Sequence, residues 1–206
     1  MKTPFGVILA GGQAQRMGGG DKGRLILGNK SLFNRVIERL KPQVGLISLN
    51  ANGHPERFAD LGLPVIADNT PGFLGPLAGI LSGLDWAYEQ GAELIVTVAA
   101  DTPFFPSDFV VKLLEAGKDM DKPLVLAATY DKAGNIRCHP TFGLWPVTLR
   151  DDLRESLNSG LRKVILWTSR HGGCEALYET AIIDPFFNIN TPEDLNVAKQ
   201  FLEAGA

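Results

Sequence analysis

The chain has few cysteines, no long apolar run and no large excess of charge. Its 206 residues include only Cys138 and Cys174, too few to form a disulfide framework. No run approaches the ~20 apolar residues of a membrane span. The first apolar run, Phe5–Ala10, is too short and too interrupted by glycine to be the core of a signal peptide. We therefore expect a cytoplasmic protein with no membrane partner.

The net charge of −3 argues against nucleic acid as a partner. The charge is unevenly distributed, because residues 1–41 carry a net +6 and the remainder a net −9. A cationic N-terminal segment suits a small anionic substrate. The sequence also shows no Ser-His-Asp or Cys-His arrangement, which argues against nucleophilic catalysis and favours phosphoryl chemistry, where positioning and charge neutralisation dominate.

Short apolar runs alternate with segments of helical periodicity over at least the first two thirds of the chain. This alternation predicts an α/β fold of three layers, a doubly wound and mostly parallel sheet, in a single domain over 1–206. We expect the nucleotide-binding part at about 1–105 and the acceptor-binding part at about 106–206. Strands are expected at 5–8, 45–51, 65–68, 94–100, 124–129 and 141–144, and helices at 32–40, 80–89, 149–157 and 161–169.

Helix ends have recognisable signals. Ser31 is expected to cap the helix that Pro42 stops, and Ser107 to cap a helix that runs to Gly117. Thr191, followed by Pro192 and by an acid at the third helical position, predicts the start of the last helix. The pair His139-Pro140 is expected in a loop between two strands.

The most informative segment is a glycine-rich loop, Leu9–Lys22, that follows the first predicted strand. Successive backbone N–H groups in such a loop form a concavity that suits phosphate, and Arg16 and Lys22 supply positive charge. The spacing matches neither the P-loop nor the dinucleotide fingerprint. A nucleotide triphosphate loop is our first interpretation, and a flexible linker is the alternative.

Ligands of open parallel sheets bind outside the carboxyl ends of the strands. Three further polar residues stand at such ends, namely Asn50, Asp68 and Asp101. Asp101 follows the long apolar strand and is well placed to hold Mg²⁺, which takes one or two carboxylates plus water and substrate phosphates. Each residue also has a plainer interpretation, as part of a turn.

These motifs resemble those of the molybdenum cofactor guanylyltransferase family, a branch of the nucleotidyltransferases with a Rossmann-like fold. The resemblance rests on five segments that occur in the family's order over nearly the whole chain: L-A-G-G-x-x-x-R-M-G-x-x-D-K at Leu9–Lys22, G-P-L-A-G at Gly75–Gly79, D-T-P at Asp101–Pro103, H-P at His139–Pro140, and N-x-N-T-P-E-D-L at Asn188–Leu195.

The resemblance implies transfer of a guanylyl group from GTP to the terminal phosphate of molybdopterin, with release of pyrophosphate. It implies catalytic roles for Arg16, Lys22 and Asp101, with Asp101 holding Mg²⁺. GTP would be bound by Leu9, Ala10, Gly11, Lys22, Asn50, Asp68 and Asp101, and the acceptor by Asn188 and Asn190. We further expect a monomer that makes transient contact with molybdenum-cofactor insertion proteins.

Two alternatives stay open. One is a cytidylyl- or other nucleotidyltransferase acting on a related phosphorylated acceptor, since the glycine loop does not encode the base. The other is a non-catalytic nucleotide- or cofactor-binding adaptor, against which the presence of both Lys22 and Asp101 argues.

Overall fold

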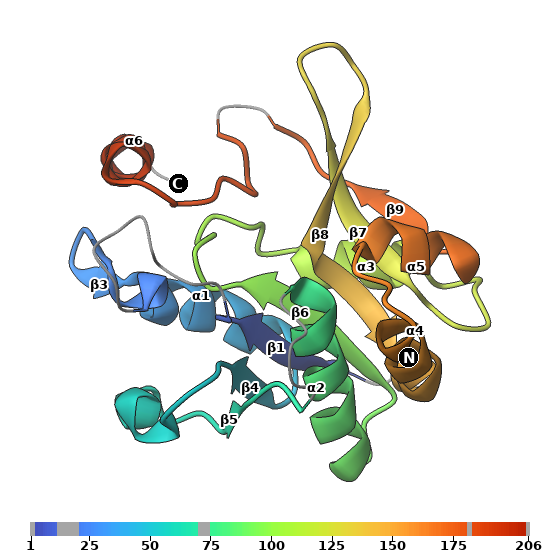
Figure 1. Ribbon diagram of the computed structural model, residues 1–206. Helices are drawn as coiled ribbons and strands as arrows, with labels where there is room; N and C mark the ends of the chain where they lie inside the picture. Colours follow the sequence, from blue (N-terminus) through green and yellow to red (C-terminus); the bar gives the residue numbers. More distant parts are fainter. Residues whose placement is uncertain (1–2, 12–20, 70–74, 181–182, 205–206) are drawn as a thin grey trace.

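A computed structural model describes residues 3–11, 21–69, 75–180 and 183–204. Within these residues a seven-stranded sheet has the order β5-β4-β1-β6-β8-β7-β9 (Figure 1). Only β8 runs antiparallel to its neighbours in this sheet, so the prediction of a mostly parallel sheet is confirmed. The strands are β1 (Phe5–Leu9), β4 (Ile47–Asn50), β5 (Val65–Ile66), β6 (Leu94–Ala99), β7 (Val125–Tyr130), β8 (Ile136–Pro146) and β9 (Cys174–Leu177).

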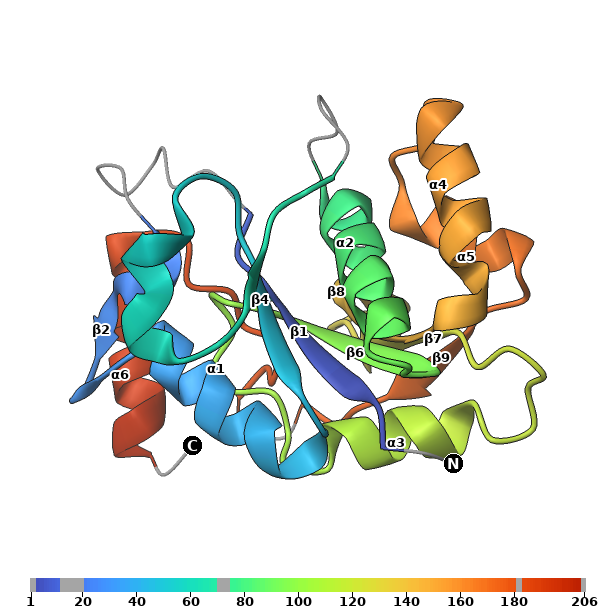
Figure 2. The same cartoon turned by 90° about the horizontal axis from the view of Figure 1, so that it is seen from below.

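Helices cover both faces of the sheet, which confirms the three layers (Figure 2). On one face lie α1 (Leu32–Leu40) and α3 (Phe109–Ala116), and on the other α2 (Pro76–Glu89), α4 (Arg150–Asn158) and α5 (Val164–Arg170). Because successive strand residues point to opposite faces, Ile8 joins the cluster with α1 and α3, whereas Val7 joins the cluster with α2, α4 and α5. Both faces of β1 are therefore buried.

The predicted caps were only partly right. The Ser31 hydroxyl accepts a hydrogen bond from the Asn34 N–H at 3.2 Å, and Thr191 with Asp194 forms a capping box at α6 (Pro192–Glu203). Ser107 is not a cap, because Asp108 holds the N-cap position of α3 and neither side chain bonds the helix end. Helix α2 begins at Pro76 rather than Ile80, since proline at the first position costs no hydrogen bond.

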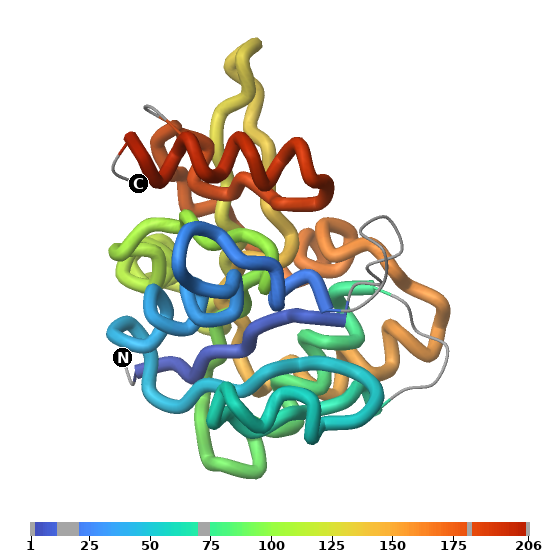
Figure 3. The backbone as a smooth tube through the Cα atoms, turned by 90° about the vertical axis from the view of Figure 1, so that its left-hand side faces the viewer, coloured from blue at the N-terminus to red at the C-terminus, as the bar shows by residue number. Residues whose placement is uncertain are grey.

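Helix α6 packs on a small hairpin of β2 (Ile26–Leu27) and β3 (Lys30–Ser31), which the sequence did not reveal. A separate cluster joins Leu27, Phe104, Ile189 and Ala198. This packing lays the C-terminal segment alongside the chain that follows the glycine loop (Figure 3). Residues far apart in the sequence thereby meet above one edge of the sheet.

Strand β8 is much longer than the predicted 141–144. Its N-terminal half pairs with β7 in a hairpin that projects from the body of the molecule (Figure 1). His139 and Pro140 therefore lie within a strand, and the expected loop there is wrong. Strand β9 was missed, because Cys174–Leu177 contains no β-branched residue to indicate it. No described helix is long and apolar enough to cross a bilayer.

Candidate nucleotide and acceptor site

The carboxyl ends of three neighbouring strands stop at one level. Leu9 of β1 pairs with Asn50 of β4 on one side and with Ala99 of β6 on the other. Asn50 also pairs with Ile66 of β5, which places Asp68 just beyond the same edge. The predicted convergence of Asn50, Asp68 and Asp101 on the edge that follows Leu9 is thus what the structure shows.

Lys22 lies beside the ends of β1 and β6. Its Nζ donates a hydrogen bond to Oδ1 of Asn190 at 2.6 Å and is 3.7 Å from Oδ2 of Asp101. The Lys22 and Asp101 side chains are each about one-fifth exposed, so a ligand can reach both. A cavity of about 40 Å³ beside them is also lined by Leu9 and Ala10, two of the residues expected to bind GTP through their backbone.

Asp101 is mostly buried, and this burial raises the pKa of its carboxyl group. The positive charge of Lys22 and a hydrogen bond from Thr102 oppose the rise in pKa. An incompletely compensated carboxylate at a reachable position fits a cation. No cluster of three or more His, Cys, Asp or Glu residues able to hold a metal occurs in the described chain. A Mg²⁺ ion here would therefore take most of its ligands from phosphate and water, which is its usual preference.

Thr102 is a site residue that the sequence analysis did not single out. Its side chain is fully buried, and its hydroxyl donates to Oδ1 of Asn188 while lying 3.2 Å from Oδ1 of Asp101. The Ile189 N–H donates to the Asp101 carbonyl at 2.9 Å. The signal was present, since Thr102 stands inside the D-T-P motif beside Asp101.

Asn188 and Asn190 flank Ile189, and the three residues alternate in direction. Ile189 is fully buried in the cluster beneath α6. Asn188 and Asn190 instead contact Thr102 and Lys22. The N-x-N spacing thus places both amides at the Asp101 site, as an extended segment requires.

Asn50 and Asp68 form a second polar cluster on the same edge. Nδ2 of Asn50 donates to Oδ1 of Asp68 at 3.0 Å and to the Ile66 carbonyl at 3.2 Å. Asn52, which the sequence analysis did not consider, donates to Oδ2 of Asp68 at 2.9 Å and accepts from its N–H at 2.8 Å. Both carboxylate oxygens of Asp68 are therefore held by amides.

Glycine at position 79 lets α2 approach Asn50. A Cβ there would collide with Oδ1 of Asn50 and lie 2.9 Å from Cδ2 of Leu9. The second glycine of the G-P-L-A-G segment therefore allows the first turn of α2 to pack closely against the ends of β1 and β4.

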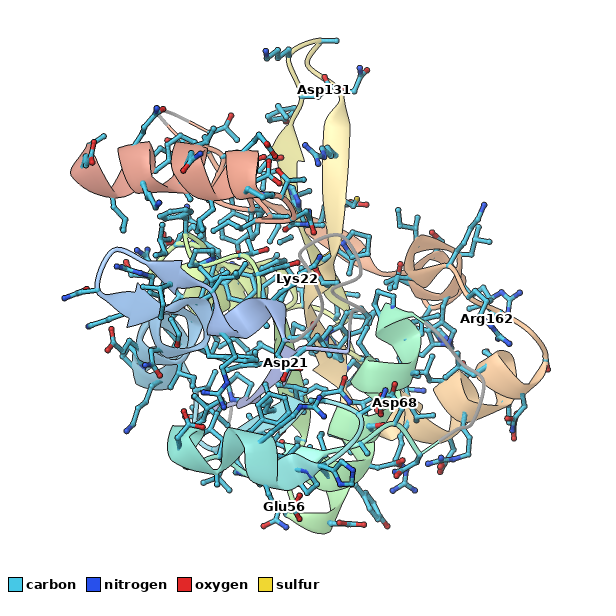
Figure 4. All side chains as sticks on the ribbon, turned by 60° about the vertical axis from the view of Figure 1, so that its left-hand side comes forward. Asp21, Lys22, Glu56, Asp68, Asp131 and Arg162 are labelled. Atoms are coloured by element: carbon cyan, nitrogen blue, oxygen red, sulfur yellow. The ribbon has the colours of Figure 1, made fainter. Side chains whose placement is uncertain are left out.

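Residues that were not predicted to belong to the site hold the two neighbours of Lys22, Asp21 and Gly23, in place. Arg57 donates to both oxygens of Asp21, at 2.9 and 3.2 Å, and its guanidinium lies over the Phe58 ring. A Cβ at Gly23 would collide with the Phe33 ring. Figure 4 shows Asp21, Lys22 and Asp68 on one side of the molecule, with Asp131 away from them at the hairpin tip. Arg16, predicted to be catalytic, falls outside the described residues.

Comparisons with known proteins identify the family of this chain. The family described as "MobA-like NTP transferase domain" matches residues 6–172. The molybdenum cofactor guanylyltransferase of Mesorhizobium japonicum is 47% identical over 204 residues, which cover 97% of this chain and 96% of that protein. The protein of the same name from Rhodopseudomonas palustris is 49% identical, over 94% of this chain and 91% of the relative.

Two solved structures share the fold. A structure described as molybdopterin-guanine dinucleotide biosynthesis protein A from Archaeoglobus fulgidus has a TM-score of 0.72 at 22% identity, covering 97% of this chain and 99% of its own. A 4-diphosphocytidyl-2C-methyl-D-erythritol synthase from Anaerococcus prevotii has a TM-score of 0.71 at 16% identity, covering 98% and 96%. At these identities the likeness concerns the fold alone.

Proposed function

We propose that this chain, which belongs to the MobA-like NTP transferase domain family, is a molybdenum cofactor guanylyltransferase. It transfers GMP from GTP to the terminal phosphate of molybdopterin and so forms the guanine dinucleotide form of the cofactor. One structural observation carries the proposal, namely the position of Lys22 Nζ between Asp101 and Asn190. That position joins the glycine loop, the end of β6 and the segment before α6 in one polar site.

The nucleotide is held by the first half of the chain. Leu9 ends β1 and, with Ala10, lines the cavity beside Lys22. The Ala10 N–H donates to the Asn50 carbonyl at 2.9 Å, so the N–H that suits a phosphate oxygen is that of Gly11. Asn50 and Asp68 contact the nucleoside from the neighbouring strand ends.

In the transfer, an oxygen of the acceptor phosphate forms a bond to the α-phosphorus. The bond from that phosphorus to the α,β-bridging oxygen breaks, and pyrophosphate leaves with the electron pair. A phosphate monoester has a second pKa near ~6, so the acceptor is largely dianionic at neutral pH and needs no strong general base. The difficulty is repulsion between anions, which Lys22 and Arg16 reduce.

Asp101 would hold Mg²⁺, which neutralises phosphate charge when bound. Asn188 and Asn190 belong to the segment before α6, where they contact Thr102 and Lys22, and they contact the acceptor. Asn188 is exposed and Asn190 half-buried, so both amides are reachable. A monomeric state, cytoplasmic location and contact with insertion proteins stay predictions.

The choice of base is tested by incubating the protein and molybdopterin with each of GTP, ATP, CTP and UTP, and measuring pyrophosphate and the dinucleotide product. We expect turnover with GTP. Turnover with CTP and none with GTP would support a cytidylyltransferase instead, a reaction that the shared fold accommodates. Nucleotide binding without turnover by any of the four would support the adaptor.

The role of Asp101 is tested by Asp101→Ala. We expect loss of activity with an unchanged circular dichroism spectrum. Asp121→Ala is the matched control, because Asp121 is an exposed carboxylate in the loop before β7. Full activity of Asp101→Ala would remove this carboxylate from the mechanism.

A further inference from the structure

A second cavity lies away from Lys22 and Asp101. Its volume is about 390 Å³, which is within the range of small-molecule sites. It is bounded by α1, by the segment that joins β6 to α3, and by Leu202 near the end of α6. None of the residues proposed to bind GTP or the acceptor lines it.

Two arginines of α1 face this cavity without a carboxylate partner in the described part of the chain. Arg35 and Arg39 are four residues apart and so lie on the same helix face. Glu38 also lines the wall, but Lys30 holds both of its oxygens, at 2.8 and 2.7 Å. The cavity therefore keeps an excess of two positive charges.

Both guanidinium groups are held by backbone carbonyls, which fixes them before any ligand arrives. Nε and Nη2 of Arg35 donate to the Leu27 carbonyl at 2.9 and 2.6 Å. Gly28 follows with φ +65°, and a Cβ there would lie 2.9 Å from Arg35 Nη2, so the turn requires glycine. Nη1 of Arg39 donates to the Phe105 carbonyl at 3.1 Å. The remaining donor nitrogens, Nη1 of Arg35 and Nε and Nη2 of Arg39, have no partner among the described residues.

The pKa of Arg39 also indicates that its positive charge is poorly compensated in the described part of the chain. Burial lowers the pKa of Arg39, and the positive charge of Arg35 lowers it further. Two half-buried cations that repel one another are stabilised by an anion placed between them.

We propose that this cavity is a second anion site, which binds a small organic molecule through a dianionic phosphate group. The phosphate matches the two arginines in charge and in its capacity for charge-assisted hydrogen bonds. Phe104, Leu202 and Pro42 supply apolar walls for the rest of the molecule, and Ser107 stands at the exposed rim. The inference does not depend on the proposed guanylyl transfer.

The test is calorimetric titration at pH 8 with phenyl phosphate, and separately with inorganic phosphate. We expect phenyl phosphate to bind at least fivefold more tightly than inorganic phosphate, because its ring packs on the apolar walls. Equal affinity for the two would overturn the assignment to an organic molecule. Absence of binding at millimolar concentration would overturn the site itself.

Variants test this site directly. Arg39→Gln should weaken phenyl phosphate binding at least tenfold. Ser107→Glu should do the same by repulsion, and it alters only an exposed side chain, so it covers the case in which Arg39→Gln fails to fold. Lys41→Gln, which removes a neighbouring exposed cation, should bind as the unmodified protein does. Binding that survives Ser107→Glu, or that is lost in Lys41→Gln, would overturn the proposal.

Discussion

The Lys22 ammonium group donates a hydrogen bond to Oδ1 of Asn190, which is 168 residues further along the chain. This contact joins the loop after the first strand to the segment that precedes the last helix. Asp101 stands 3.7 Å from the same nitrogen. These two partners orient the ammonium group before a nucleotide binds. A triphosphate oxygen that reaches Lys22 would then compete with both of them.

The two ends of this contact should affect different substrates. Lys22→Met removes the cation that we propose to face the developing charge, and kcat/KM for GTP should fall by about 10²–10³. Asn190→Ala should raise the KM for molybdopterin about tenfold and leave GTP binding unchanged, because Lys22 keeps Asp101 as a partner. Steady-state kinetics with each substrate varied in turn measures both effects.

Lys199→Met is the control for that experiment, since Lys199 is an exposed cation on α6 and should leave both KM values unchanged. A rise in the KM for GTP as large as that for molybdopterin in Asn190→Ala would contradict a role on the acceptor side.

Thr102→Val tests the bridge between Asp101 and Asn188. The substitution keeps the shape of the side chain and leaves Oδ1 of Asn188 without its hydroxyl donor. We expect the free energy of unfolding to fall by about 1–2 kcal/mol and kcat to fall about tenfold, because Asp101 and Asn188 lose their common support. Thr102→Ser, which keeps the hydroxyl, should recover most of the activity.

Thr97→Val is a matched control for this bridge. Thr97 is an equally buried threonine of β6 whose hydroxyl accepts from Trp145 Nε1 at 2.9 Å, away from Asp101. It should lose a similar free energy of unfolding and retain kcat. An equal loss of kcat in the two variants would mean that Thr102 acts only through stability.

The sheet was predictable from the sequence because both sides of its central strands are buried. Residues 94–100 are apolar almost throughout, and the structure buries every residue of β6. Polar residues at the ends of such strands must then share one edge, which is how Asn50, Asp68 and Asp101 could be grouped without a structure.

The contacts that involve residues distant in sequence could not be predicted. The local periodicity of a sequence indicates helices and strands, but it does not indicate that Arg57 pairs with Asp21 or that Lys22 contacts Asn190. The full length of β8 was missed for a different reason, because the strand begins with two exposed residues and contains Pro140. Proline within a run argues against a strand, and only the pairing with β7 shows that this segment is one.

Gly79 should be intolerant of a side chain for a functional reason. In Gly79→Ala the added Cβ displaces the Asn50 amide, which loosens its hydrogen bonds to Asp68 and Ile66. We expect the KM for GTP to rise about tenfold, measured by initial rates at saturating molybdopterin.

Gly83→Ala is the control on the same helix, one turn further on. Its Cβ would lie 2.8 Å from Cγ2 of Val7 and so overpacks apolar side chains only. It should lower the free energy of unfolding by about 1–3 kcal/mol and leave the KM for GTP unchanged. A similar rise in KM for both alanine variants would show that general distortion of α2, rather than displacement of Asn50, is responsible.

His139 should make the protein less stable as the pH falls from 6.5 towards 4. The ring is buried, stacks on Phe186 with centroids 4.3 Å apart, and has Nε2 2.9 Å from the Thr129 hydroxyl. Burial lowers the pKa of His139 from 6.5 to about 4. Between these values the unfolded chain binds a proton at this residue that the folded chain does not, so stability rises with pH across the window.

The contribution of His139 to this loss is about 2 kcal/mol between pH 7.5 and pH 5, from the free energy equivalent of a pKa difference. Urea unfolding at the two pH values measures the total change. In His139→Gln the change should be smaller by about that amount, whereas His54→Gln, at an exposed position, should match the unmodified protein. If His139→Gln loses as much stability on acidification as the unmodified protein, the buried ring is not the group that titrates.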